Sequence, residues 1–436
     1  MNEILAIWAE WIKPSAGLPT VQWSILLAVA AAAGHLFNRY SGLPKVVGYS
    51  LVGGVAGLAG FTGAAWPLQG TGLFLLELAV AVVLFEAGGR IPLRWFRHNP
   101  MVLVQSLTES VLTLVLVYAA LRFMGVREVV SESLALLAMA ASPAVLARVA
   151  IDTRAAGPVT DRALVLSTLS TLYALTLCSA RAGMMPRGES GLTSTLYPVL
   201  VVLGLSVVVG AVLALTLRTA LRVMSPTSEN TAILLLAMIA AGAALAAHFG
   251  GSAPLAALLG GMLLKQLNPR PWSWPRQMGT ASSMLTMLMF VLVSVVAAQA
   301  DWSLPVVGLV IVLVLARFVA KIGGVAIGNV GTGASWTQAL WVGCAMTPMS
   351  SVALLLVSQF VASAPSVVGR QIAGVALPAI LLMELLGAVL ATLAIYRAGE
   401  SSKPWVWLSR TPAPAVAPAV PSATTPAPRT GVAHES

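Results

Sequence analysis

Charge is scarce in this sequence. Lysine, arginine, aspartate and glutamate together make up 9% of its 436 residues, whereas hydrophobic residues make up 58%. So few charges cannot cover a soluble surface, which excludes a soluble enzyme or binding domain, and no cofactor is expected. Cysteine is also rare: Cys178 and Cys344 both fall in apolar segments, and no disulfide is expected. The composition therefore indicates an all-α polytopic membrane protein.

Apolar segments long enough to cross a bilayer recur along the chain, separated by short charged or Gly/Pro-rich turns. They predict about thirteen transmembrane helices, at residues 21–37, 46–66, 71–88, 101–123, 130–150, 163–180, 196–217, 231–249, 253–267, 281–300, 304–327, 336–360 and 372–395. The expected transmembrane domain covers residues 21–400. We expect residues 1–20 to form an amphipathic segment at the membrane interface, and residues 401–436 to form a disordered Pro/Ala-rich cytoplasmic tail.

Basic residues are unevenly distributed between alternate loops. With the N-terminus outside, about seventeen lysines and arginines fall on the cytoplasmic side and about six on the other. The sequence therefore predicts an integral protein of a bacterial inner membrane with a cytoplasmic C-terminus. Because these residues are dispersed through inner loops, the net charge of +10 needs no nucleic-acid partner, and the expected partner is the lipid bilayer.

Two apolar segments are interrupted midway by the same kind of step, Ala141-Ser142-Pro143 in one and Met346-Thr347-Pro348 in the other. Proline has no N–H and its ring clashes with the preceding turn, so each step frees backbone groups that lipid cannot satisfy. Such breaks persist only where they line a cavity, and a pair of them in corresponding halves is typical of a transporter's binding site. We expect Pro143 and Pro348 to break the fifth and twelfth spans, and the two breaks to cross near the bilayer midplane.

Several short motifs then suggest a family. They occur at residues 43–49 (LPKVVGY), 85–89 (FEAGG), 141–145 (ASPAV), 250–255 (GGSAPL) and 321–324 (KIGG). In this order they are similar to the signatures of the cation:proton antiporter superfamily, the sodium/proton and potassium/proton exchangers. The resemblance extends over nearly the whole apolar region.

The resemblance implies a fold and an activity. Members with thirteen spans form two inverted repeats whose fifth and twelfth helices are discontinuous and cross, and they divide into interleaved scaffold and core subdomains. They are secondary transporters rather than enzymes, dimerise through the scaffold, and exchange Na⁺ or K⁺ for protons by alternating access. No metal is expected beyond a transported monovalent cation.

The chain departs from the family at the ion site. Related exchangers carry one or two aspartates in the sixth span, where this sequence has Ser170 and Thr171. The three aspartates of the chain are all expected in loops. Hydroxyl groups can coordinate a cation, but they cannot exchange a proton near neutral pH. The sequence thus predicts a polar cavity with no carboxylate at its centre, bound by the side chains of Ser142, Ser170, Thr171, Thr347, Ser350 and Ser351.

Four charged residues remain deep within the spans: Glu109, Arg317, Lys321 and Glu384. Charges at membrane depth are costly and are functional candidates by default. Counting 1.5 Å per residue from the span ends places Glu109 at the depth of Lys321, and Glu384 at the depth of Arg317. We therefore expect these to form two ion pairs, which could carry the transport or brace the fold.

Three interpretations remain open. The chain could be a proton-coupled monovalent cation exchanger in which a glutamate replaces the missing aspartate. It could carry another solute, such as an anion, at a carboxylate-free site of hydroxyls, half-helix N-termini and an uncompensated Lys321 or Arg317. It could also be a transport-inactive relative that acts as a membrane scaffold or sensor.

Overall fold

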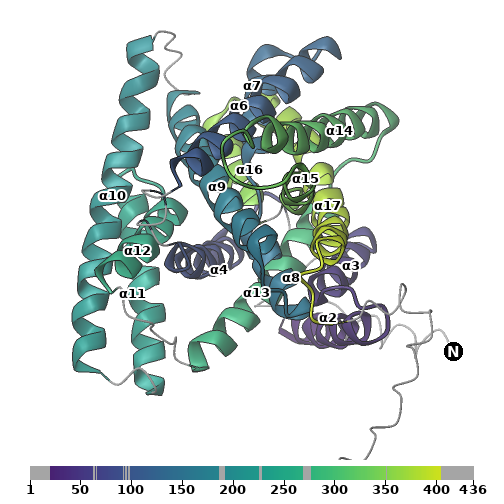
Figure 1. Cartoon of the computed structure of the whole chain (residues 1–436). Helices are drawn as coiled ribbons and strands as arrows, with labels where there is room; N and C mark the ends of the chain where they lie inside the picture. The colour runs from purple at the N-terminus through teal and green to yellow at the C-terminus, as the bar shows by residue number, and fades with distance from the viewer. Residues whose placement is uncertain are drawn as a thin grey trace, which may run out of the picture.

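The structure, a computed structural model, is helical throughout the part of the chain that it describes, apart from turns and one isolated bridge between Ala155 and Ser401. It describes residues 20–61, 64, 66–91, 93, 96, 99–185, 192–224, 228–268, 276–349 and 351–403. The interfacial segment expected at residues 1–20 and the tail expected at 401–436 lie almost wholly outside these ranges. Figure 1 shows α10 and α11 on one side of the molecule and α3 and α17 on the other.

The helices follow the apolar segments of the sequence. They are α2 (Thr20–Tyr40), α3 (Lys45–Leu58), α4 (Gly70–Gly89), α6 (Pro100–Phe123), α7 (Glu128–Met139), α8 (Pro143–Thr153), α9 (Pro158–Met184), α10 (Leu192–Val223), α11 (Glu229–His248), α12 (Ala253–Leu267), α13 (Arg276–Ala298), α14 (Leu304–Ile327), α15 (Trp336–Ala345), α16 (Ser351–Ser363) and α17 (Ser366–Arg397). Ten segments, counting α7 with α8, are long and apolar enough to cross a membrane. Adding α3, α12 and the pair α15 and α16 gives the thirteen segments predicted.

Both predicted breaks are present. The fifth span divides into α7 and α8 around Ser142, whose hydroxyl accepts a hydrogen bond from the backbone N–H of Val145 at 3.3 Å and so caps α8. Pro143 occupies the first turn of α8, where its missing N–H costs nothing. The twelfth span divides between Ala345 and Ser351. Each break therefore turns a single apolar segment into two half-helices with unsatisfied ends.

The packing of the helices repeats between the two halves of the chain. The contact of α3 with α13 corresponds to that of α12 with α4, and α6 contacts α7 as α14 contacts α15. Likewise, α9 packs on α15 and α16 as α17 packs on α7 and α8. Equivalent helices are seven spans apart, and an odd offset inverts one half relative to the other. The described helices thus form the two inverted repeats that were predicted.

These contacts also sort the helices into two groups. The first helix group consists of α2, α3, α4 and α10 to α13, and the second helix group of α6 to α9 and α14 to α17; most of the extensive contacts fall within a group. Both broken spans belong to the second helix group. Contacts between the groups are made chiefly by α9 on one side and α17 on the other.

Two glycines bring helices of the second group close together. A Cβ atom on Gly324 would lie 2.5 Å from the Cα of Glu109, so α6 and α14 touch backbone to backbone at this level. A Cβ on Gly387 would lie 2.5 Å from the Cα of Pro348, so α17 packs directly on the break of the twelfth span. Only glycine permits either approach, and both position the charged side chains described below.

Two of the three aspartates are not in loops, contrary to the prediction. Asp152 lies in the last turn of α8 and accepts a hydrogen bond from the backbone N–H of Lys45 at 2.8 Å, and Asp161 lies in the first turn of α9. The left-handed Arg154 (φ 50°) and Pro158 confine the connection to a few residues, so both helices extend beyond their apolar segments.

Candidate functional site

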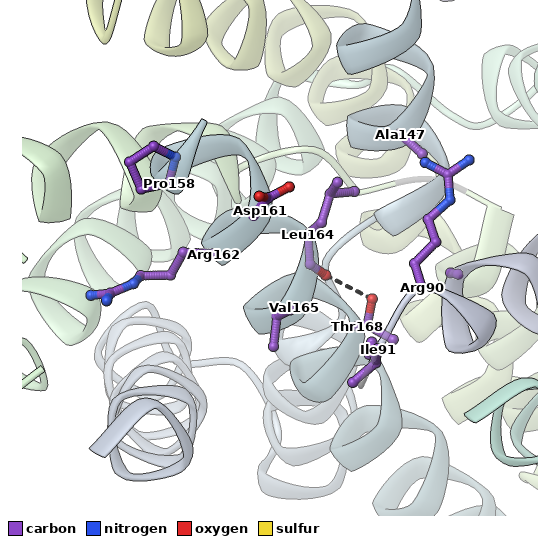
Figure 2. Close-up of a pocket in the computed structure, with 10 residues that line it drawn as sticks. Arg90, Ile91, Ala147, Pro158, Asp161, Arg162, Leu164, Val165 and Thr168 are labelled. Carbon is purple, nitrogen blue, oxygen red and sulfur yellow. Dashed lines mark hydrogen bonds between the residues drawn. The ribbon is translucent and has the colours of Figure 1, made fainter. Parts of the chain in front are cut away.

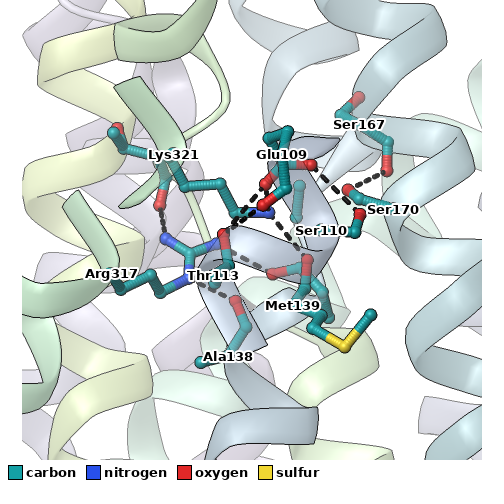
Figure 3. Close-up of polar contacts among 12 residues, drawn as sticks. Glu109, Ser110, Thr113, Ala138, Met139, Ser167, Ser170, Arg317 and Lys321 are labelled. Atoms are coloured by element: carbon teal, nitrogen blue, oxygen red, sulfur yellow. Dashed lines mark hydrogen bonds and ion pairs between the residues drawn. The ribbon is translucent and has the colours of Figure 1, made fainter. Parts of the chain in front are cut away.

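One arginine holds both helix breaks. Arg317 of α14 is fully buried, and its guanidinium donates hydrogen bonds to the carbonyls of Ala138 (2.9 Å) and Ala140 (2.8 Å) at the end of α7. It also donates to the carbonyls of Thr347 and of Pro348 (3.3 Å), just beyond α15. Carbonyls at a helix C-terminus carry partial negative charge and favour a cation. Because one guanidinium reaches both sets, the two breaks lie side by side, as predicted (Figure 3).

A buried ion pair lies beside this crossing. The Nζ atom of Lys321 lies 2.5 Å from Oε1 of Glu109, and neither side chain is exposed. The same ammonium donates to the carbonyl of Met139, at 2.7 Å. The hydroxyl of Ser110 donates to the Glu109 carboxylate at 3.2 Å, and that of Thr113 is shared between the carbonyl of Glu109 at 2.8 Å and its carboxylate at 3.2 Å. The pair expected from the depths of these residues is therefore present, and it contacts the end of α7 directly (Figure 3).

The second expected pair is wrong. Glu384 does not contact Arg317; its Oε1 accepts hydrogen bonds from the hydroxyls of Ser50 on α3 and Ser294 on α13, the latter at 3.3 Å. Depth along a span fixes the height of a side chain but not the face of the helix on which it lies. Glu384 faces the first helix group, whereas Arg317 faces the breaks and bonds to their carbonyls.

The hydroxyl side chains of the sixth span lie at the crossing. Thr171 donates to the carbonyl of Ala141 in the first break at 2.9 Å, and also to the carbonyl of Ser167 at 2.7 Å. Ser170 is equally buried and donates to the carbonyl of Ser167 at 3.2 Å. The absence of a carboxylate predicted for this centre is wrong, because Glu109 reaches it from α6.

The hydroxyls of the second break are placed less completely. Thr347 donates to the carbonyl of Cys344 at 2.9 Å, and Ser351 begins α16 with its side chain buried. Ser350 lies outside the described residues. Thr347 contributes to the crossing mainly through its backbone carbonyl, since that atom accepts the hydrogen bond from Arg317.

A cavity of about 520 Å³ approaches the crossing between α4, α8 and α9. Its wall includes Arg90, Asp161 and Arg162, and it extends to Thr168, less than one helical turn before Thr171. Figure 2 shows Arg90 and Arg162 on opposite sides of Asp161 and Leu164. The cavity could not be predicted from the sequence, since no motif joins residues that are about seventy positions apart in the chain. The cavity therefore ends close to the crossing, while Thr171 and Glu109 themselves are fully buried.

Comparisons with known proteins agree with this geometry. The family model described as "Sodium/hydrogen exchanger, transmembrane" matches residues 25–396. Two solved structures of the sodium proton antiporter MjNhaP1 from Methanocaldococcus jannaschii are similar. One, at pH 8, is 16% identical with a TM-score of 0.66 and covers 86% of this chain and 97% of its own. The other, from electron microscopy, is 17% identical with a TM-score of 0.58, and the match covers 92% of this chain and 96% of that structure's chain. No curated protein sequence matches. At this identity the two structures establish the fold.

Proposed function

The chain belongs to the sodium/hydrogen exchanger family, and we propose that it exchanges a monovalent cation, Na⁺ or K⁺, for protons across a membrane. The family consists of transporters and not of enzymes. The observation that carries the proposal is the buried pair of Glu109 and Lys321 at the crossing of the two broken spans. It supplies the carboxylate that Ser170 and Thr171 cannot.

The pair suggests how a proton and a cation compete. A carboxylate without a partner is unfavourable in apolar surroundings, so Glu109 needs either the Lys321 ammonium or another cation. When Lys321 releases its proton, Glu109 becomes free to bind Na⁺ or K⁺; when the cation leaves, Lys321 takes up a proton again. One positive charge replaces another at each step, and the total charge of the site is unchanged.

The surrounding oxygens complete a cation site. The hydroxyls of Ser110 and Thr113 already contact the carboxylate, and Thr171 places its hydroxyl at the first break. Hydroxyl, carboxylate and carbonyl oxygens are the ligands that hard cations prefer. We assign Ser142, Ser170, Thr347 and Ser351 to the same polar region, and Ser350, outside the described residues, stays a prediction from the sequence.

Access to the site would alternate between the two sides of the membrane. The cavity that ends at Thr168 lies at the end of the molecule that the basic residues would place in the cytoplasm, so this state would be open inwards. The first helix group would act as a scaffold that forms a homodimer, and the second helix group would move as the core. The assignment to a bacterial inner membrane, with the N-terminus outside, the interfacial segment 1–20 and the cytoplasmic tail 401–436, belongs to the same proposal.

An anion carrier is a second candidate. It is favoured by the cavity wall, which holds Arg162 as well as Arg90, although Arg90 is paired with Glu86 at 2.8 Å. However, its central premise was an uncompensated cation at the crossing. Lys321 is paired with the carboxylate of Glu109, and the guanidinium of Arg317 is already bonded to four carbonyls, so neither cation is free to bind an anion.

The test is ion flux in reconstituted vesicles. Purified protein is placed in vesicles that contain a pH-sensitive dye, a pH gradient is imposed, and Na⁺, K⁺, Li⁺ or small anions are added. We expect Na⁺ or K⁺ to dissipate the gradient. Glu109→Gln should abolish the response, whereas Glu132→Gln should keep it because Glu132 only forms a half-exposed pair with Arg181. A response to anions alone would support the anion carrier, and no response to any ion would support a transport-inactive relative.

A further inference from the structure

Glu384 is a buried acid that the exchange pair does not use. Its side chain is fully buried at the centre of α17, and Leu381, one turn earlier, packs against Gly54 of α3. Both hydroxyl donors, Ser50 and Ser294, bond to the same carboxyl oxygen, Oε1. The other oxygen, Oε2, is buried and bonds to no described residue. This carboxyl group therefore lies in a small polar site with one oxygen unused.

No described side chain supplies a counter-charge to it. The helices packed on α17 are α3, α7, α8, α13, α14, α15 and α16. Together with α17 itself they carry the ionisable residues Lys45, Tyr49, Glu128, Glu132, Arg148, Asp152, Arg276, Arg317, Lys321, Cys344, Arg370, Tyr396 and Arg397. No hydrogen bond or ion pair joins any described side chain of this set to Glu384.

The two cations nearest in depth are already engaged. Arg317 bonds to the carbonyls of the breaks, and Lys321 to Glu109 and Met139. On α3 and α8, the backbone N–H of Lys45 bonds to Asp152, and Arg148 bonds to Ser283. Buried charges in proteins are paired, and an unpaired carboxyl in apolar surroundings favours its neutral form.

The hydrogen-bond pattern is that of a neutral acid. A protonated carboxyl has one carbonyl oxygen, which accepts hydrogen bonds, and one hydroxyl, which carries the proton. Oε1 accepts from both serines and Oε2 accepts from neither. Two neutral hydroxyls and no cation surround the carboxyl group, and these surroundings favour its protonated form.

The site also joins the two helix groups. Ser50 and Ser294 belong to the first helix group and lie on one rigid surface, because a Cβ on Gly53 would lie 3.0 Å from the Cβ of Ser294. Glu384 belongs to the second helix group. Any movement of α17 relative to α3 and α13 would separate the carboxyl group from both hydroxyls.

We propose that Glu384, Ser50 and Ser294 form a second proton-binding site, separate from the pair of Glu109 and Lys321, that ties α17 to α3 and α13 while Glu384 is protonated. Loss of this proton would leave an unpaired charge at the contact and favour separation of the two helix groups. The site does not depend on which solute the protein carries.

Infrared spectroscopy of the purified full-length protein tests the proposal without a transport assay. A protonated carboxyl has a carbonyl stretching band that is distinct from that of a carboxylate and shifts in heavy water. We expect this band at neutral pH in the unmodified protein, in Glu109→Gln and in Glu132→Gln, and its loss in Glu384→Gln. Replacing Ser50 and Ser294 by alanine should raise its frequency, because the carbonyl oxygen loses both donors.

A second measurement applies if a variant folds poorly. The folded state would hold a proton that the unfolded state loses above about pH 4.3, so thermal stability of the unmodified protein should fall as pH rises from there until Glu384 itself loses its proton. Glu384→Gln cannot ionise, and its stability should be less dependent on pH than that of Glu132→Gln. Absence of the band from the unmodified protein at neutral pH, or its persistence in Glu384→Gln, overturns the proposal. If Glu109→Gln loses transport but keeps the carbonyl stretching band of Glu384, the two proton-binding sites are independent, as proposed.

Discussion

Thr171 donates a hydrogen bond to the carbonyl of Ala141, 2.9 Å away, so this side chain of the sixth span is aimed at the break in the fifth span. Its hydroxyl group cannot exchange a proton near neutral pH. Glu109, on a different helix, supplies the carboxylate at the same crossing.

Thr171→Asp should therefore alter the cation response. The new carboxylate would lie within the crossing and add a titratable group beside the pair of Glu109 and Lys321. We expect a changed dependence of cation-driven proton flux on pH in vesicles. Thr171→Val removes the hydroxyl without adding a charge and is the matched control. Flux profiles identical for the aspartate variant and the unmodified protein would mean that Thr171 does not face the ion site.

Arg317→Gln should destabilise the fold. The substitution removes a buried cation from four carbonyls at the ends of two half-helices, and each buried carbonyl left without a donor costs about 1 to 3 kcal/mol. Thermal unfolding followed by circular dichroism in detergent measures the effect. Arg370→Gln, at an exposed position of α17, should leave the midpoint nearly unchanged. Equal midpoints for the two variants would show that Arg317 does not hold the breaks.

Gly324→Ala should separate α6 from α14. Its Cβ would lie 2.5 Å from the Cα of Glu109, so the backbone must shift and the distance between Glu109 and Lys321 must grow. The neighbouring Gly323→Ala is a stringent control, because there the nearest atom would be 3.6 Å away. Alanine is favoured over glycine in a helix by about 1 kcal/mol, so the control should be neutral or stabilising. We expect only Gly324→Ala to lower both thermal stability and cation-driven flux, and a neutral Gly324→Ala would contradict this close approach.

Hydropathy and the placement of proline predicted the thirteen spans and the two breaks that lie side by side. Lipid cannot satisfy free backbone groups, so a spanning segment must be helical and a break in it must be buried within the protein. The pairing of Glu109 with Lys321 followed from their depths. The partner of Glu384 could not be derived in this way, because depth says nothing about the direction of a side chain around its helix. The partners of Arg317 could not be predicted either, because they are backbone carbonyls, which every residue has. Asp152 and Asp161 lie in helix ends that extend beyond the apolar segments, and hydropathy does not predict how far such polar helix ends extend.

Proton release on cation binding tests most directly whether cation and proton compete at Glu109 and Lys321. The protein, in detergent and weak buffer with a pH-sensitive dye, is mixed with NaCl or KCl, and choline chloride serves as the ionic-strength control. We predict that Na⁺ or K⁺ releases protons from the unmodified protein and from Glu132→Gln, and that Glu109→Gln releases none. Proton release from Glu109→Gln equal to that of the unmodified protein would contradict the account.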